Sequence, residues 1–252
     1  MEIVVFFIVQ WYISLFCQSF FQHRYAAHRV CEMSPFWEKF FYILSFLSQG
    51  SSYISAYAYG IMHRMHHVHT DTPQDPHSPM NSSNVFMMMW HTKVNYNHVF
   101  FERIDINDNY RKKLPQWQSF ERFAHNWITR LTWVVLYTSF WVVFATSWWQ
   151  WILLPMTIAM GSLQGVIVNY FAHKVGYRNF SLDNTSRNIL PFFDLFFWGE
   201  SYHNNHHKYA GRANHAIKWF EFDPMYAVMR AMDFFKIIRL KRKTEKTNAL
   251  VY

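Results

Sequence analysis

The sequence predicts an all-α integral membrane protein with about three transmembrane helices, an interfacial or re-entrant helix, and a cytoplasmic helical cap that carries histidine motifs. Three observations support this fold class. Three long runs contain no charged side chain, 51% of the 252 residues are hydrophobic, and histidines recur at helical spacing near the ends of the apolar runs. No linker divides the chain, so we expect residues 1–252 to form a single domain.

The first apolar run, residues 3–22, is long enough to cross roughly 30 Å of hydrocarbon as a helix. It lacks the basic n-region and small-residue cleavage site of a signal peptide. We therefore expect it to remain in the mature protein as the first span.

Two further runs, residues 131–146 and 151–171, are separated by the Trp-rich joint SWWQW and predict a transmembrane hairpin. The joint contains no Lys or Arg, whereas residues 102–130 contain six and the C-terminal end is also basic. The positive-inside rule then places the joint and the N-terminus outside, and the histidine motifs on the cytoplasmic side.

The remaining apolar run, residues 36–60, contains Glu38 and Lys39 and lies between two groups of histidines. If these histidines serve one site, the run cannot cross the membrane, so we expect it to lie in the interface or to re-enter. The turn-rich stretch that follows, residues 71–84, is predicted to be a cytoplasmic loop.

The formal net charge of +8 is concentrated in the last part of the chain, KIIRLKRKTEK, beside apolar residues. This pattern favours contact with anionic lipid over nucleic acid as a partner. The chain has only Cys17 and Cys31, which excludes a disulfide framework and a CxxC zinc pattern.

The motifs HRMHH and HNNHH each place histidines at i, i+3 and i+4, within an arc of roughly 100° on a helix. His23 and His28 stand at i and i+5, roughly 140° apart on an α-helix, an angle that would let them reach different metals. Asn169 and His173, at i and i+4, can point to one region at the inner end of the last span. The candidate ligands are His23, His28, His63, His66, His67, His173, His203, His206 and His207.

So many imidazoles beside lipid are costly unless a metal holds them, and neutral imidazole is the commonest metal-binding side chain. Any single histidine could instead be an interfacial or buried polar residue. Imidazole suits zinc, copper, nickel and iron, but nine ligands exceed what one ion accepts, which favours two ions and, as a hypothesis, two irons. Four acids near the motifs are candidates to orient the rings through their other N–H: Asp71, Asp75, Asp194 and Glu200.

The motifs HRYAAHR, HRMHH and HNNHH, together with NYFAH, TDTPQDPHSP and WGESYHNNHH, resemble the membrane fatty acid desaturase family, particularly its stearoyl-CoA (acyl-CoA delta-9) desaturase-like branch. The likeness covers nearly the whole chain. It implies a di-iron centre held by the nine histidines, with Asn169 acting through a bound water. It also implies that the protein uses dioxygen to remove two hydrogens from adjacent methylenes of a fatty acyl chain.

The chain departs from many eukaryotic acyl-CoA members of this family, which have Arg-Asp before the second motif and Trp three positions before the Asn. Here those places hold Ile61, Met62 and Val166. A CoA thioester, an acyl-carrier-protein thioester and a membrane lipid all remain possible carriers of the acyl chain.

The chain contains no HPGG-type cytochrome b5 signature, so we expect a separate ferredoxin, cytochrome or flavoprotein system to donate electrons. Two alternatives stay open: a related di-iron hydroxylase, because the same oxidant can return oxygen to the substrate, and a non-enzymatic membrane metal carrier. The low charge of the spans favours a fixed site at their inner ends over a transport path.

Overall fold

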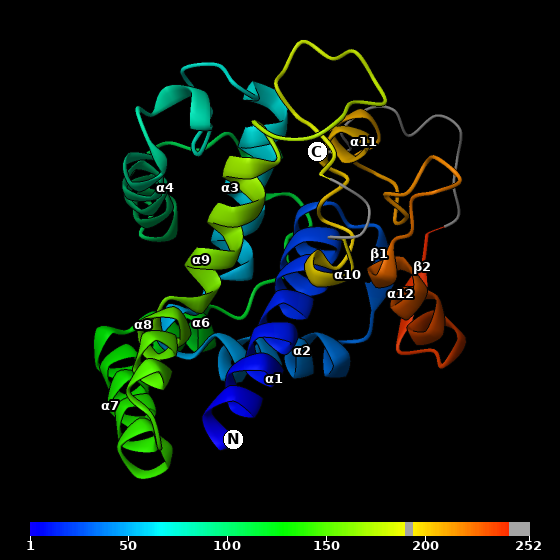
Figure 1. The fold of residues 1–252 in the computed structure, drawn as a ribbon. Helices are drawn as coiled ribbons and strands as arrows, with labels where there is room; N and C mark the ends of the chain where they lie inside the picture. Colours follow the sequence, from blue (N-terminus) through cyan, green and yellow to red (C-terminus); the bar gives the residue numbers. More distant parts are fainter. Residues whose placement is uncertain (190–193, 242–252) are drawn as a thin grey trace.

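The structure is a computed structural model that describes residues 1–189 and 194–241, and it is mostly helical (Figure 1). The elements, in which η denotes a 3-10 or π-helix, are α1 (Glu2–Phe16), η1 (Cys17–Ala27), β1 (Cys31–Met33), α2 (Pro35–Gln49), η2 (Gly50–Ser52), α3 (Ala56–His69), η3 (Pro79–Asn81), α4 (Val85–Phe100), α5 (Asp108–Arg111), α6 (Gln118–His125), α7 (Trp127–Phe144), η4 (Trp148–Ile152), α8 (Leu153–Ile158), α9 (Met160–Val166), η5 (Ile167–Phe171), α10 (Asp194–Phe197), α11 (His203–Lys208), α12 (Pro224–Phe234) and β2 (Ile238–Leu240). The basic segment predicted at the C-terminus lies outside the described residues from position 242 onward.

The first span is one continuous helix of 26 residues, formed by α1 and η1 together. It continues five residues beyond the predicted run 3–22, so its C-terminal end carries the first histidine motif. The last part, η1, is a π-helix, in which the N–H of His28 donates to the carbonyl of His23 at 3.1 Å.

The predicted hairpin is present, but its second arm is bent. Helix α7 is apolar and long enough to cross a membrane, whereas Trp148–Ile158 and Met160–Phe171 meet at 77°. By length and composition, the described residues therefore provide two candidate spans, or three if the bent pair counts as one. The third predicted span, over 151–171, thus takes the form of a bent pair of helices, and the count of three spans stays a prediction.

Side chains from neighbouring elements satisfy the backbone groups that the bend leaves free. The hydroxyl of Ser51 donates to the carbonyl of Ile158 at 2.7 Å, and the hydroxyl of Ser52 accepts from the N–H of Gly161 at 2.8 Å. Gln18 donates to the carbonyl of Gly161 at 3.1 Å. Irregular backbone at membrane depth is stable only when protein groups satisfy it in this way.

A buried glutamine fixes the bent arm against the first span. The side-chain oxygen of Gln164 accepts from Ser14 and from Gln18, both at 2.7 Å, and its nitrogen donates to the carbonyl of Trp11 at 2.9 Å. These bonds set the position of η5, which leads to His173, relative to η1, which carries His23.

The run 36–60 breaks into α2, η2 and the start of α3, and neither helix of this run qualifies as a span within the described residues. The break occurs at Gly50, whose φ of 52° is a conformation that favours glycine, and whose missing Cβ would lie 1.9 Å from the hydroxyl of Tyr137. Helix α2 leaves a row of exposed apolar side chains at helical spacing: Phe36, Phe40, Ile43 and Leu47. Its placement in the membrane interface stays a prediction.

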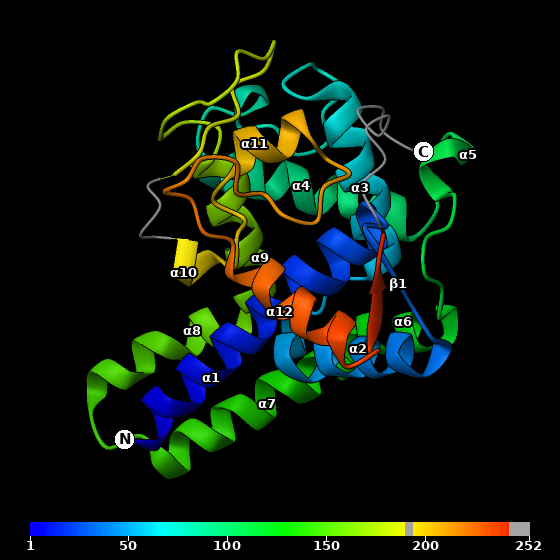
Figure 2. The same cartoon turned by 90° about the vertical axis from the view of Figure 1, so that its right-hand side faces the viewer.

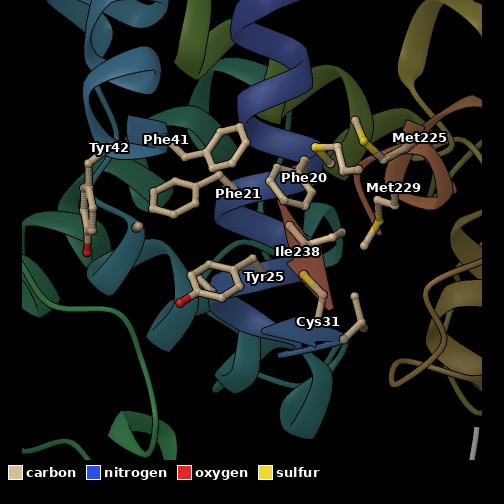
Figure 3. Close-up of a cluster of buried hydrophobic side chains, with 13 residues drawn as sticks. Phe20, Phe21, Tyr25, Cys31, Phe41, Tyr42, Met225, Met229 and Ile238 are labelled. Atoms are coloured by element: carbon tan, nitrogen blue, oxygen red, sulfur yellow. The ribbon is translucent and has the colours of Figure 1, made fainter. Parts of the chain in front are cut away.

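The C-terminal part of the chain packs against the first histidine helix. Phe20, Phe21 and Tyr25 of the first span meet Met225 and Met229 of α12 in one buried cluster (Figure 3). Two three-residue strands, which the sequence analysis did not predict, add an antiparallel pairing of β1 with β2. Residues 225–240 are thus joined to the end of the first span that carries the histidine motif.

The elements separate into two regions. Helices α1, α7 and α8 extend together toward one end of the molecule, where the N-terminus lies, and α3, α4 and α11 lie at the other (Figures 1 and 2). Because α3 and α11 carry the second and third histidine motifs, the candidate site lies at the end of the molecule away from the N-terminus.

Candidate metal centre

The nine predicted histidines form two groups, in each of which one ring nitrogen per residue lies within 4.8 Å of all the others. The first group has five members and the second has four. In order they are His23, His28, His63, His67 and His206, and then His66, His173, His203 and His207. Each group has the composition of a site for one ion.

Helices α3 and α11 each contribute to both groups. Helix α3 provides His63 and His67 to the first group and His66 to the second, whereas α11 provides His206 to the first and its two other histidines to the second. The sequence predicted that the three histidines of each motif share one helix face. This is compatible with the division, because the two groups are adjacent and one face can contribute to both.

The structure corrects the interpretation of His23 and His28. On an α-helix they would diverge, but η1 has the i to i+5 hydrogen bonds of a π-helix, which bring these two positions nearly above one another. Their ring centroids are 4.8 Å apart, and both rings belong to the first group.

The ring nitrogens approach one another as ligands of a common ion would. In the first group, the Nε2–Nε2 distances are 2.8 Å for His28–His63 and His67–His206, and 3.0 Å for His63–His67 and His23–His206. In the second group, they are 3.0 Å for His203–His207, 3.1 Å for His173–His203 and 3.2 Å for His66–His207. Two nitrogens that bind one ion at right angles, each at roughly 2.1 Å, lie about 3.0 Å apart. The two groups therefore fit metal ions at their centres.

Burial favours the neutral form of rings in both groups. Burial lowers the pKa of His63, His203 and His206 well below the ordinary value. A neutral imidazole keeps the lone pair that a metal requires. Facing lone pairs this close together repel one another, so a cation between them would remove an unfavourable interaction.

Three of the predicted acids lie at the outer nitrogen of a ring. Nδ1 of His66 is 2.8 Å from Asp75, and Nδ1 of His23 is 2.6 Å from Glu200. Nδ1 of His173 is 3.6 Å from Asp71. A carboxylate at Nδ1 directs Nε2 toward the centre and makes it a stronger donor to a metal.

Asp75 and Glu200 are ionised at neutral pH. Burial raises the pKa of each carboxyl, but the adjacent histidine outweighs it, so that the pKa of each falls to about 2. Both can therefore offset the positive charge that metal ions would bring to an all-imidazole shell.

The comparison with known families agrees with this geometry. The family model described as "Fatty acid desaturase" matches residues 3–236, nearly the whole chain. This chain belongs to the fatty acid desaturase family. The match confirms the resemblance carried by the three histidine motifs.

Relatives within the desaturase family bear related names. Delta-9 desaturase-like 3 protein and Delta-9 acyl-lipid desaturase 1 of Arabidopsis thaliana are 29% and 28% identical, over 88% and 86% of this chain and 70% and 67% of their own. Hex-5-enoyl-(acyl-carrier protein) acetylenase of Moorena producens (strain JHB) is 26% identical, over 88% of this chain and 71% of its own. This chain thus spans about two thirds of the length of these relatives.

The remaining two predicted residues of this desaturase-family chain take different positions. Asn169 lies in η5 one turn before His173 and is half-buried, and its action through a water stays a prediction. Asp194 was predicted to orient a histidine ring, but it accepts hydrogen bonds from the N–H and the hydroxyl of Ser201 instead. These bonds stabilise the turn before HNNHH. Burial raises the pKa of Asp194 to about 8.

The sequence analysis missed a buried arginine that supports the first group. Arg24 is fully buried, pairs with Asp223 at 2.9 Å and lies 3.4 Å from Glu200, the carboxylate that holds His23. Gly199 passes so close that a Cβ there would lie 2.2 Å from Asp223. The available signal was an arginine directly beside His23 inside the HRYAAHR motif.

Two further histidines adjoin the groups and were also missed. The ring of His215 lies 4.6 Å from that of His206, and His77 stacks on His66 with centroids 4.4 Å apart. His77 can also join His66 and Asp75 in a third set of close ligand atoms. Since Nδ1 of His66 already meets Asp75, we interpret this set as the outer layer of the second group.

Proposed function

We propose that this protein is an oxygen-dependent fatty acyl desaturase that introduces a carbon–carbon double bond at a histidine-held di-iron centre. The observation that carries the proposal is the division of nine histidines into two adjacent ligand groups in a member of the fatty acid desaturase family. A carrier of metal ions would need no such pair of closed groups supported by carboxylates.

The first group would hold one iron through five imidazoles, and the second group would hold the other through four imidazoles with Asn169 acting through a water. Two irons bound here would supply the activation of dioxygen, with two electrons and two protons consumed as two hydrogens leave adjacent methylenes and both oxygen atoms leave as water. The protein's own contribution is to fix the rings and to exclude bulk water.

The carboxylates determine how the rings are presented. Asp75 and Glu200 pair with the outer nitrogens of two rings, and Asp71 accepts from the hydroxyl of Thr185, which lies 3.1 Å from Nδ1 of His173. These rings therefore need little rearrangement when metal binds. The buried Arg24 in turn holds Glu200 in place. The acyl chain itself is featureless, so its register must come from the shape of an apolar passage next to the centre.

The substrate is a fatty acyl chain in a membrane context, and its carrier is open. One relative is named for an acyl lipid and another for an acyl-carrier protein. We further propose that the site faces the cytoplasm and receives electrons from a separate ferredoxin, cytochrome or flavoprotein donor.

The test is the acyl-chain profile of an aerobic host that expresses the wild type, H203A or H91A, with double bonds located by derivatisation. His203 belongs to the second ligand group, whereas His91 is an exposed histidine of α4 and serves as the matched control. We expect a new alkene with the wild type and H91A, and its loss in H203A together with loss of bound iron. Hydroxylated chains in place of the alkene would establish the hydroxylase alternative, and an alkene from H203A would refute the site.

A further inference from the structure

Helix α11 cannot hold its position alone, although it carries three of the nine histidines. It has only six residues, and the residue before it, Tyr202, makes no capping hydrogen bond with its side chain. Helices this short are not stable in water, and the N–H groups of their first turn need acceptors. Something outside the helix must therefore fix it.

Asn188, sixteen positions before Asn204, provides the missing acceptor. Its side-chain oxygen accepts from the N–H of Asn204 at 2.9 Å and from the N–H of Asn205 at 3.2 Å. Its side-chain nitrogen donates to the side-chain oxygen of Asn205 at 3.0 Å. These are the bonds of an N-cap, made by a residue distant in sequence.

The backbone of Asn188 is itself held rigidly. Its N–H donates to the carbonyl of Tyr177 at 2.7 Å, and its carbonyl accepts from the N–H of Tyr177 at 2.8 Å. Gly176 allows this approach: it has a φ of 120°, and a Cβ there would lie 2.0 Å from the carbonyl oxygen of Asn188. The side chain of Asn188 is also fully buried, so it has one position from which to reach α11.

The same segment joins the two elements that supply the second ligand group. The N–H of Arg187 donates to the carbonyl of Ala172 at 2.7 Å, directly before His173. On the other side, the N–H of Ile189 donates to the carbonyl of Ser201 at 2.9 Å, two residues before His203. Asn188 thus lies between the end of the bent span and the start of α11.

We propose that Asn188 is a positioning residue that caps α11 from a distance and keeps its ring nitrogens in register with both ligand groups. The inference rests on the proposed metal centre. Nothing in the HNNHH motif itself would make this cap, because its own asparagines are used elsewhere. The side-chain oxygen of Asn204 accepts from the N–H of Phe180 at 2.8 Å, and that of Asn205 accepts from the side chain of Asn179 at 2.8 Å.

The experiment titrates the purified, metal-free full-length protein with Co²⁺ and follows the ligand-field absorption of the bound ion. The variants are N188L, which removes the cap, and N188D, which keeps an acceptor oxygen at the same place. N84A is the matched control, since Asn84 caps α4 through the N–H of Met87 at 3.0 Å and that helix carries no candidate ligand. Hydrogen exchange at the amides of residues 204 and 205 is measured in parallel.

We expect N188L to bind Co²⁺ roughly 10- to 100-fold more weakly and to exchange both amides faster. Because Asp and Asn are about equally good N-caps, but Asp loses the donor bond to Asn205, N188D should bind Co²⁺ with an affinity between those of N188L and the wild type. N84A should stay within about threefold of the wild type.

If N188L binds Co²⁺ with wild-type affinity and its two amides exchange at the wild-type rate, the inference is overturned but the proposed metal centre is not. The same holds if N188D binds as weakly as N188L, which would point to packing or to the donor bond instead of the cap. If N188L folds poorly, the comparison of N188D with the wild type and the exchange of the two amides still decide between these roles. Failure of the wild type to bind Co²⁺ would instead refute the metal centre, and the inference with it.

Discussion

Replacement of Arg24 by methionine should destabilise the protein and loosen the first ligand group. The guanidinium is fully buried and makes a two-pronged pair with Asp223 at 2.9 and 3.1 Å. It also donates to the carbonyl of Ala213 at 2.6 Å and lies 3.4 Å from Glu200. Methionine fills much of the same volume but leaves two buried carboxylates without their cation.

The expected loss follows from that arrangement. Removing one partner of a buried ion pair costs about 3–5 kcal/mol, because the remaining charge stays buried and uncompensated. For a chain of this size, each kcal/mol shifts the Tm by about 2–4 °C, so R24M should lower it by roughly 6–20 °C. The double variant R24M/D223N should recover at least about 1 kcal/mol, since it removes one of the stranded charges.

The assay is thermal unfolding in detergent, combined with metal analysis of the purified protein. R239M is the control, because Arg239 is exposed on β2 and its replacement should change the free energy of unfolding by no more than about 0.5 kcal/mol. A loss in R24M no larger than in R239M, or a double variant less stable than R24M, would refute the argument that buried charge pairing holds this region together.

Three further predictions concern other parts of the site. Q164L should lower the free energy of unfolding by about 1–3 kcal/mol, since it removes the acceptor of buried Ser14 and Gln18, and an unchanged Tm would contradict this. D75N should weaken metal binding by the second group roughly 10-fold or more, because an amide does not hold Nδ1 of His66 as a carboxylate does. An equal loss of affinity at both groups in a metal titration would argue against two separate sites. N169A should reduce desaturation more than iron content, and parallel loss of both would indicate that the asparagine binds the metal directly.

The candidate ligands could be chosen from the sequence, because the side chains that share one helix face depend on local spacing. Histidines at i, i+3 and i+4 share one helix face whatever the rest of the fold does. Acids a few residues from a motif have a good chance of reaching its rings, as Asp75 and Glu200 do. Apolar runs without charge likewise indicated where spans form, because the hydrocarbon thickness sets their length.

The division of the ligands between two groups was decided only by the tertiary structure. The π-helix that brings His23 and His28 together depends on how η1 packs against α2 and α12, and no spacing rule predicts it. The bend of the last span likewise requires acceptors and donors from η2 and from Gln18. These partners lie more than 100 positions away in the chain, so a pattern read over one or two helical turns contains no information about them.

The same reason explains why the supporting residues were missed. Arg24 and Asp223 are 199 positions apart, and an isolated arginine beside a histidine looks like a surface charge until its partner is placed. Asn188 looks like any loop asparagine until the fold brings it to the start of α11. By itself, the sequence determined which atoms can bind metal; the tertiary structure decided which of them meet and what holds them there, because contacts between distant segments form only when the whole chain packs.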